Sequence, residues 1–152
     1  MTSTAALTAA QRVQALGACP VFSSVPPGDL GVLAEMMQTE YLLVGEILFE
    51  SGDPSDRTCV VVSGRLAILL PGRSDPVRRL GPGELLGEYG MLAGSVRTAS
   101  VRAEADTVLL SLDYRRFRAF LIHFPETMFV LFRTAVQRLI ALEQKGEGAS
   151  SV

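Results

Sequence analysis

The stretch "GELLGEYGMLAGSVRTASV", residues 83–101, sets two glutamates and one arginine in an otherwise apolar, glycine-rich background. Its central part, "GEYGML", predicts a short helical turn that begins at Gly87. Such a turn presents free backbone N–H groups, which attract an anion. Arg97 follows on a loop, directly before the predicted strand "TASVRA". The stretch therefore places a cation close to a set of backbone donors.

Arg97 and Glu88 point to different parts of one ligand. A guanidinium beside exposed amides forms a site for a single phosphate, through two parallel charge-assisted hydrogen bonds. Glu88 cannot bind the same phosphate because like charges repel, but it can accept a hydrogen bond from a hydroxyl such as a ribose 2′-OH. The pair suits a ligand with one phosphate, one free sugar hydroxyl and an apolar remainder. The alternative is a plain ion pair between Glu88 and Arg97 across the loop, and the residues alone leave both open.

Length and composition indicate one globular domain. The chain has 152 residues, 48% apolar and 20% charged, which is enough for one hydrophobic core and too little for two. The net charge of −2 argues against a general nucleic-acid binder. No apolar run approaches the roughly 20 residues that span a bilayer, and the N-terminus lacks the features of a signal peptide. We therefore expect a cytoplasmic protein without a membrane partner, in which Cys19 and Cys59 are buried thiols.

Three regions differ in their hydrophobic periodicity. Residues 1–38 predict helices, one around Thr8 to Cys19 and a second that Pro26 and Pro27 open. Residues 39–112 hold the runs "EYLLVGEILFESGD", "RTCVVVSGRLAILLPG" and "ASVRAEADTVLLSL", which are short, apolar and cut by Gly, Pro, Ser and Asp. This spacing predicts an antiparallel barrel or sandwich, with turn glycines of positive φ at positions 64, 72 and 83.

The last region predicts two helices. Asp113 is the expected N-cap of the first, and Pro125 begins the second, longer one. The single domain is therefore expected to span residues 1–145, with a flexible tail at 146–152. Its fold class is mainly β: an antiparallel β-roll or jelly-roll barrel over 39–112, preceded by N-terminal helices and followed by C-terminal helices at 113–145.

Several kinds of chemistry are disfavoured by the composition. His123 is the only histidine, so a histidine-rich metal site is absent, and we expect His123 to be structural rather than a ligand. No serine sits in a nucleophile-elbow context, and "GRLAILLPG" lacks the lysine of a phosphate-binding loop. We expect no catalysis, no metal and no cofactor.

The quoted stretch resembles the phosphate-binding cassette of the cyclic nucleotide-binding domain family. That pattern is a glycine-glutamate pair, a short apolar turn, a few loop residues, an arginine, two small residues and an apolar strand. In this chain it reads Gly87-Glu88, Tyr89 to Leu92, Ala93 to Val96, Arg97-Thr98-Ala99 and Val101. The resemblance covers roughly residues 20–143 and includes "VGEILFESGD", "VVVSGRLAIL", "RRLGPGELLGE" and "DYRRFRAFLIHFPE".

The resemblance implies a β-roll and a set of site residues. It implies Glu88 on the ribose 2′-OH and Arg97 on the cyclic phosphate, with backbone amides completing the phosphate cradle. The ligand-binding residues that follow from it are Gly87, Glu88, Tyr89, Gly90, Met91, Leu92, Arg97, Thr98, Ala99 and Arg138. The chain departs from the family pattern at Tyr89 and Gly90, where an aliphatic residue and an alanine are usual, and at Val96, which replaces a frequent proline.

The function that the resemblance implies is a stand-alone receptor for cAMP or cGMP that signals to a protein partner by changing shape. The alternative is a constitutive interaction or dimerisation module with a vestigial or empty pocket; the presence of both Glu88 and Arg97 favours the receptor. A threonine such as Thr98 often accompanies cGMP binding in the family, whereas cAMP is the bacterial default, so the base stays open.

The last predicted helix, "MFVLFRTAVQRLIAL", carries an apolar stripe: Phe129, Phe132, Val136, Leu139 and Ile140. Helical spacing of this kind indicates core or a dimer seam. The resemblance implies that this helix is a lid over the base and a possible homodimer contact. It also implies that Arg138 approaches Glu88 or the ribose when the site is occupied; the alternative is a solvated charge. The chain ends within about ten residues of this helix, so we expect no DNA-recognition helix and no direct DNA binding.

Overall fold

Two antiparallel sheets form a roll in the computed structural model, which describes residues 6–145. In spatial order the first sheet consists of β1 (Gln38–Leu42), β8 (Thr107–Asp113), β3 (Arg57–Ser63) and β6 (Leu85–Leu86). The second consists of β2 (Ile47–Phe49), β7 (Ser100–Ala103), β4 (Leu66–Leu69) and β5 (Arg78–Leu80). The predicted fold class, an antiparallel β-roll with flanking helices, is confirmed.

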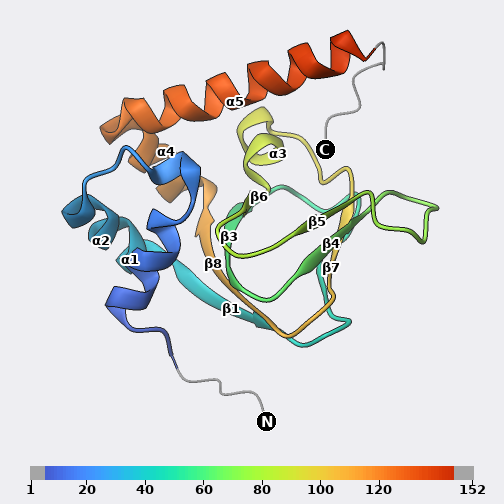
Figure 1. The fold of residues 1–152 in the computed structure, drawn as a ribbon, viewed down its shortest axis with the longest axis horizontal. Helices are drawn as coiled ribbons and strands as arrows, with labels where there is room; N and C mark the ends of the chain where they lie inside the picture. The colour runs from blue at the N-terminus through green and yellow to red at the C-terminus, as the bar shows by residue number, and fades with distance from the viewer. Residues whose placement is uncertain (1–5, 146–152) are drawn as a thin grey trace.

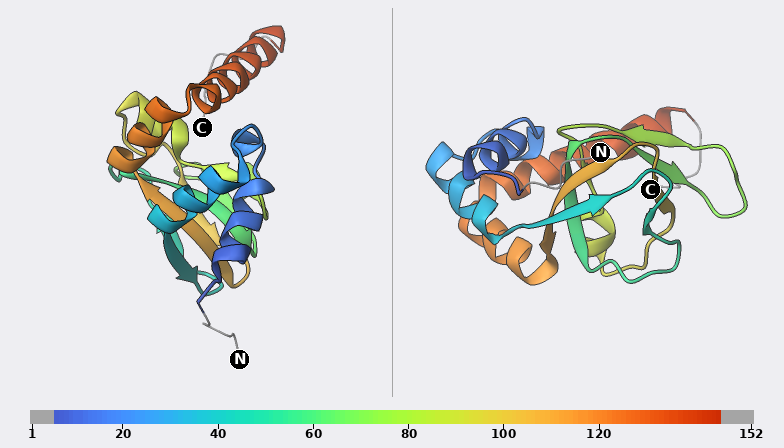
Figure 2. Two further views of the ribbon diagram at one scale, coloured as in Figure 1. Left: turned by 90° about the vertical axis from the view of Figure 1, so that its left-hand side faces the viewer. Right: turned by 90° about the horizontal axis from the view of Figure 1, so that it is seen from below.

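The helices gather at one end of the roll and along one side of it. They are α1 (Ala9–Gly17), a 3₁₀ turn η1 (Pro20–Phe22), α2 (Pro27–Met36), α3 (Glu88–Ala93), α4 (Tyr114–His123) and α5 (Pro125–Gln144). Figures 1 and 2 show α1 and α2 at the end opposite the β4–β5 loop. The long helix α5 passes over α3 in Figure 1, and this brings the C-terminal part of the described chain close to residues 87–93.

Local sequence signals explain where the helices begin. Thr8 accepts a hydrogen bond from the Gln11 amide while the Gln11 side chain accepts one from the Thr8 amide, which forms a capping box. Asp113 accepts a hydrogen bond from the Arg116 amide at 2.9 Å, as expected for the N-cap of α4. Pro125 occupies the first turn of α5, where its missing N–H has no intrahelical partner to lose.

The three predicted β runs are strands, but each divides into two around a turn. Leu43 to Glu46 separate β1 from β2, and Gly64 with φ +98° lies between β3 and β4. The other two turn glycines, at 72 and 83, also have positive φ. The sequence reading missed β5 and β6, which are only 3 and 2 residues long. Strands this short carry no alternation pattern of their own, and they form because β4 and β3 offer them backbone partners.

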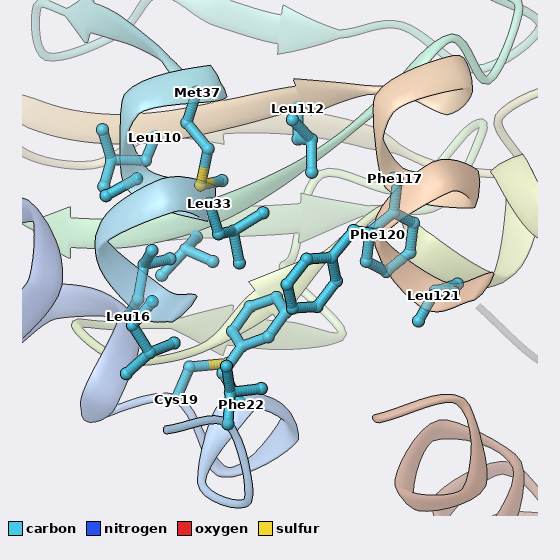
Figure 3. Close-up of a cluster of buried hydrophobic side chains, with 14 of the residues drawn as sticks. Leu16, Cys19, Phe22, Leu33, Met37, Leu110, Leu112, Phe117, Phe120 and Leu121 are labelled. Carbon is cyan, nitrogen blue, oxygen red and sulfur yellow. The ribbon is translucent and has the colours of Figure 1, made fainter. Parts of the chain in front are cut away.

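The two central strands of the first sheet, β8 and β3, are buried on both faces, which explains their nearly continuous apolar sequences. Leu110 and Leu112 of β8 pack with α1, η1, α2 and α4 in one core cluster (Figure 3), whereas Leu109 packs inside the roll in a second cluster. Neighbouring β3 divides in the same way, with Val60 in the first cluster and Val61 in the second. Successive side chains of a strand point to opposite faces, so a strand between two cores needs no polar positions.

The two cysteines are free and buried, as predicted. Burial is the largest effect on both thiols and raises the pKa of Cys19 to about 11 and that of Cys59 to about 12. Both are therefore protonated and weakly nucleophilic at neutral pH. They act as small apolar core residues.

None of the helices described between residues 6 and 145 is by itself long and apolar enough to cross a membrane. The pair α4 and α5 passes that test together by length and composition, but the two helices are bent by 109° at the break between them. The predicted tail at 146–152 lies outside the described residues, as do residues 1–5 of the predicted domain.

Gly64, in the turn between β3 and β4, has no room for a side chain. Substituting it therefore tests how closely this turn packs against Thr107. A Cβ there would lie 2.4 Å from Thr107 Oγ1 and 2.6 Å from the Asp106 carbonyl oxygen. Gly45 has a similar φ of +91° but nothing within 4 Å of its Cβ position. We expect Gly45→Ala to lower the free energy of unfolding by about 1–2 kcal/mol through backbone strain, and Gly64→Ala by about 1–3 kcal/mol more through the added clash. Urea denaturation followed by circular dichroism measures both, and equal losses would contradict the close approach.

Candidate functional site

The backbone at Gly87 turns strand β6 into helix α3. Gly87 has φ +84° and is the N-cap of the helix, so the predicted glycine-led turn is confirmed. A Cβ at this position would lie 2.6 Å from Arg97 Nη1 and 3.0 Å from the Arg57 carbonyl oxygen. The position therefore needs glycine twice over, for its left-handed backbone and for the space that the guanidinium occupies.

Arg97 is a buried cation whose guanidinium is fixed by backbone carbonyl groups. Its side chain is only 7% exposed. Nη1 donates to the Gly87 carbonyl oxygen at 3.0 Å and Nη2 donates to that of Arg57. These bonds use two of the five N–H donors of a guanidinium, while the buried Nε has no hydrogen-bond partner in the described part of the chain.

The backbone of Arg97 is held as firmly as its side chain. Its amide donates to the Asp53 carbonyl oxygen and its own carbonyl accepts from the Gly52 amide, both at 2.8 Å. Burial lowers the pKa of Arg97, but an arginine starts so high that it stays charged at neutral pH. The site thus contains a permanent, partly desolvated positive charge.

Glu88 is equally buried and does not pair with Arg97. It is 7% exposed, and no salt bridge joins it to Arg97 although both residues are described. Burial is the largest effect on its pKa and raises it, while its own backbone amide and then Arg138, Arg78 and Arg97 lower it. The alternative of a plain ion pair is therefore not what this structure forms.

The two charged residues share a pocket of about 220 Å³. Eight of the ten predicted site residues line it: Gly87, Glu88, Tyr89, Gly90, Arg97, Thr98, Ala99 and Arg138. Met91 and Leu92 do not line it. Successive residues of a helix point about 100° apart, so Met91 turns into the helical core at 2% exposure, while Leu92 lies on the surface at 39% exposure.

The sequence reading missed the floor of the pocket. Its additional lining residues come from β2, β4, β5, β6, β7, the end of α3 and the loops beside them: Phe49, Ser55, Ile68, Arg78, Leu80, Leu85, Leu86, Ala93, Ser95, Val96 and Val101. Most of these are apolar residues of β runs, which sequence alone assigns to the core. In the folded β-roll, part of this apolar surface faces a pocket.

The glycine at position 90, where the family usually has alanine, has a structural explanation. A Cβ at Gly90 would lie 2.8 Å from Ser55 Oγ. The Ser55 hydroxyl occupies that space and is buried without a hydrogen-bond partner in the described residues. Gly90 and Ser55 are therefore complementary in volume: the serine fills what the glycine leaves empty.

Helix α5 reaches the pocket through Arg138. Its guanidinium carbon lies 5.3 Å from the centre of the Tyr89 ring, within the range of a cation–π contact. Arg138 is exposed but lines the pocket, and its charge acts on Glu88. The contact ties α5 to α3 at the edge of the site. Its predicted movement toward the ribose in the occupied state stays a prediction.

The apolar stripe of α5 faces solvent in the chain as described. Phe129 is 60% exposed, Phe132 66% and Leu139 51%, with Val136 and Ile140 also exposed. Of the two predicted roles for the stripe, core is excluded within this structure. His123, in the last turn of α4, is exposed as well, and no cluster of metal-ligating residues is found in the described part of the chain.

The sequence profile described as "Cyclic nucleotide-binding domain" matches residues 39–124, which is more than half of the chain. The chain belongs to the cyclic nucleotide-binding domain family. The match includes the strands of both sheets from Thr39 onward, α3, Glu88, Arg97 and α4, but not Arg138. The family resemblance drawn from the cassette is thereby confirmed.

Two relatives that this cyclic nucleotide-binding domain matches are longer proteins than this chain. It is 30% identical over 138 residues to a cyclic nucleotide-gated potassium channel of Mesorhizobium japonicum, covering 91% of this chain and 36% of the channel. It is 26% identical over 122 residues to a CRP-like cAMP-activated global transcriptional regulator of Mycobacterium tuberculosis, covering 78% of this chain and 54% of the regulator. Its length therefore corresponds to between about a third and about half of these relatives.

A solved structure matches the cyclic nucleotide-binding domain over nearly its whole length. It is the crystal structure of the N-terminal domain of a transcriptional regulator from Streptomyces coelicolor A3(2), which is 29% identical with a TM-score of 0.71. The alignment covers 90% of this chain and 99% of that one. The two chains are similar at the level of one whole domain.

The raised pKa of Glu88 predicts how its removal changes stability with pH. The folded protein holds the Glu88 proton more tightly than the unfolded chain, whose carboxyl has an ordinary pKa near 4.5, so the wild type loses stability as pH rises from 4.5 through the raised value. Glu88→Gln cannot titrate. We expect the free energy of unfolding of Glu88→Gln, relative to wild type, to increase across that window and then level off.

Chemical denaturation between pH 4 and pH 8 measures this difference. Asp113→Asn is the control: the Arg116 amide lowers the Asp113 pKa from its ordinary value of 3.8, so Asp113 is largely ionised in the folded and unfolded chain across this range, and the difference between Asp113→Asn and wild type should change little with pH. A Glu88→Gln difference that stayed constant with pH would contradict the assigned shift.

Proposed function

We propose that this domain is a receptor for a cyclic nucleotide, cAMP or cGMP, and that its occupancy is read by a protein partner through α5. The observation that carries the proposal is a buried guanidinium and a buried carboxyl in one pocket, without a salt bridge between them. Burying two charged side chains that do not neutralise each other is unfavourable. A ligand that offers an anion to one and a hydroxyl to the other removes that penalty.

Arg97 is proposed to bind the cyclic phosphate. Its Nε lacks an acceptor and its Nη atoms each keep a second hydrogen, so a phosphate oxygen supplies what the backbone does not. Gly87, Thr98 and Ala99 line the same pocket, and their backbone amides are proposed to complete the phosphate site. A singly charged cyclic phosphate matches Arg97, the buried one of the three arginines that line the pocket.

Glu88 is proposed to accept a hydrogen bond from the ribose 2′-OH. Its desolvated carboxyl gains more from such a bond than an exposed one would, because the local dielectric is low. The apolar floor, which includes Ile68, Leu80 and Val101, suits the faces of a purine. We favour cAMP because the Mycobacterium relative is named as cAMP-activated, while the hydroxyl of Thr98 keeps cGMP as the second ligand to test.

The output is proposed to be a contact with a protein, through the apolar stripe of α5 defined by Phe129, Phe132, Val136, Leu139 and Ile140. Apolar residues at this spacing fit a second copy of the helix in a homodimer or a helix of an effector. The net charge of −2 favours a protein over nucleic acid as partner. The free thiols at 19 and 59 suit a reducing compartment, so we place the receptor in the cytoplasm.

The second candidate is a constitutive interaction module that uses the exposed stripe and binds no nucleotide. The stripe is the observation that favours it, because an apolar surface needs a partner whether or not the pocket is filled. Isothermal titration calorimetry of the 152-residue chain with cAMP and with cGMP separates the two candidates. Absence of heat with both nucleotides would leave only the interaction module.

Arg97→Ala tests the phosphate assignment. It removes charge-assisted hydrogen bonds of about 1.5–3 kcal/mol each, so we expect cAMP affinity to fall by about 100-fold or more. The matched control is Arg102→Ala, which removes an arginine of β7 that does not line the pocket and should leave affinity unchanged. Equal affinities of Arg97→Ala and wild type would refute the role of Arg97.

Arg138→Ala tests whether the pocket is coupled to α5. A ligand shifts a conformational equilibrium only through contacts that differ between the states, and Arg138 is the candidate contact. We expect cAMP to protect α5 from chymotrypsin in the wild type and to protect it at least several-fold less in Arg138→Ala. Chymotrypsin is chosen because it does not cleave at arginine.

Arg133→Ala is the control for this experiment. Arg133 lies on the same helix and also stacks on a ring, with its guanidinium carbon 5.9 Å from the centre of Phe129, but it does not line the pocket. If ligand protects α5 equally in all three proteins, Arg138 does not transmit occupancy.

A further inference from the structure

Phe49 lies beneath the cation of the pocket. The guanidinium carbon of Arg97 is 3.8 Å from the centre of the Phe49 ring and lies over its face. Phe49 is 4% exposed and Arg97 is 7% exposed, so water is largely excluded from the contact. The face of an aromatic ring carries partial negative charge, and a cation–π contact is strongest when it is desolvated.

The ring covers one face of a guanidinium whose hydrogen bonds lie along its edge. Gly87 and Arg57 accept hydrogen bonds from its Nη atoms through their carbonyl oxygens, and these bonds restrain the plane of the group. They leave its face to be covered by something else. An aliphatic side chain would fill that volume but would offer the charge no attraction.

Phe49 is itself fixed by the sheet. It pairs with Val101 of β7, and the register shifts between Ile47 and Phe49. A β-bulge of this kind re-aims the side chain that follows it. The Phe49 ring consequently lies among the pocket-lining residues, although β2 is a short strand of the roll.

A second arginine near the same ring is already neutralised. The guanidinium carbon of Arg57 lies 4.7 Å from the Phe49 ring centre, but Arg57 forms two hydrogen bonds to the Glu40 carboxylate, at 2.8 and 2.9 Å. Its charge is therefore taken up by Glu40. Arg97 has no salt bridge in the described residues. Its charge is therefore not neutralised by a carboxylate and can attract an anionic ligand.

We propose that Phe49 is a positioning residue, whose ring holds the Arg97 guanidinium in the pocket before any ligand arrives. The inference rests on the proposed function, in which Arg97 receives an anion. An incoming phosphate then meets a cation that is already placed, and the ordering of a long, flexible side chain does not have to be supplied by binding. Phe49 itself makes no bond to the ligand.

The first test needs no ligand. Protons over the face of an aromatic ring resonate upfield, because the ring current opposes the applied field there. We expect the Hε and Hδ resonances of Arg97 in the free wild-type chain to lie upfield of those of Arg102, and to return to ordinary positions in Phe49→Leu. Arg97 resonances that the substitution leaves in place would overturn the inference.

The second test is a double-mutant cycle on cAMP affinity, measured by NMR titration so that weak binding is still quantified. We expect Phe49→Leu to reduce affinity by about 10-fold in the wild type and to have no effect in Arg97→Ala. An equal loss in both backgrounds would overturn the inference, because the ring would then act on the pocket without acting through Arg97. Phe49→Met serves as the second variant if Phe49→Leu does not fold.

Phe117→Leu is the matched control for both tests. Phe117 is fully buried in α4 and does not line the pocket. Its substitution is expected to lower the melting temperature while leaving cAMP affinity and the Arg97 resonances unchanged. If the wild type binds neither cAMP nor cGMP, the proposed function fails, whereas this inference is overturned only by the Arg97 resonances or the cycle.

Discussion

A desolvated guanidinium is the constraint around which this site is organised. Arg97 is buried against the apolar cluster that fills the roll, so a group that contacts its guanidinium has to accept a hydrogen bond, present the negative face of an aromatic ring or leave room for it. Gly87 accepts a hydrogen bond from the guanidinium through its carbonyl oxygen, and because it has no Cβ it also leaves room for that group. The Arg57 carbonyl and the Phe49 ring supply the remaining contacts. The residues around Arg97 therefore depend on one another.

Helix α3 connects this site to the rest of the molecule. Glu88 on one of its faces lies in the pocket, and Met91 on another packs in the helical core together with Leu131 of α5. Tyr89 contacts Arg138, also on α5. One short helix therefore shares contacts with the proposed ligand site, the helical core and the long C-terminal helix. A displacement of α3 cannot leave α5 unaffected, because packed interiors do not absorb volume changes freely.

The sequence was sufficient for the fold class, the glycine-led turn and most of the pocket rim, because these depend on local signals. Gly87, Asp113 and Pro125 each specify a backbone geometry by their own chemistry. The floor of the pocket could not be predicted, because Phe49, Ile68 and Leu80 have the same periodicity as ordinary core residues. Their place in the site depends on strand pairing across the roll. The exposure of the α5 stripe could not be predicted for the same reason, because an apolar stripe has the same sequence pattern whether another element covers it or not.

The strand order of the first sheet has a consequence for synthesis on the ribosome. β8 lies between β1 and β3, and pairs Gln38 with Ser111 and Arg57 with Asp113. Neither partner can complete its ladder until the nascent chain has been extended through residue 113 and that segment has left the exit tunnel. The helices that pack on Leu110 and Leu112 must wait for the same event. Assembly of this domain is thus a late, concerted step, and a stalled chain that ends before β8 would leave β1 unpaired and one edge of the apolar strand β3 open to chaperones.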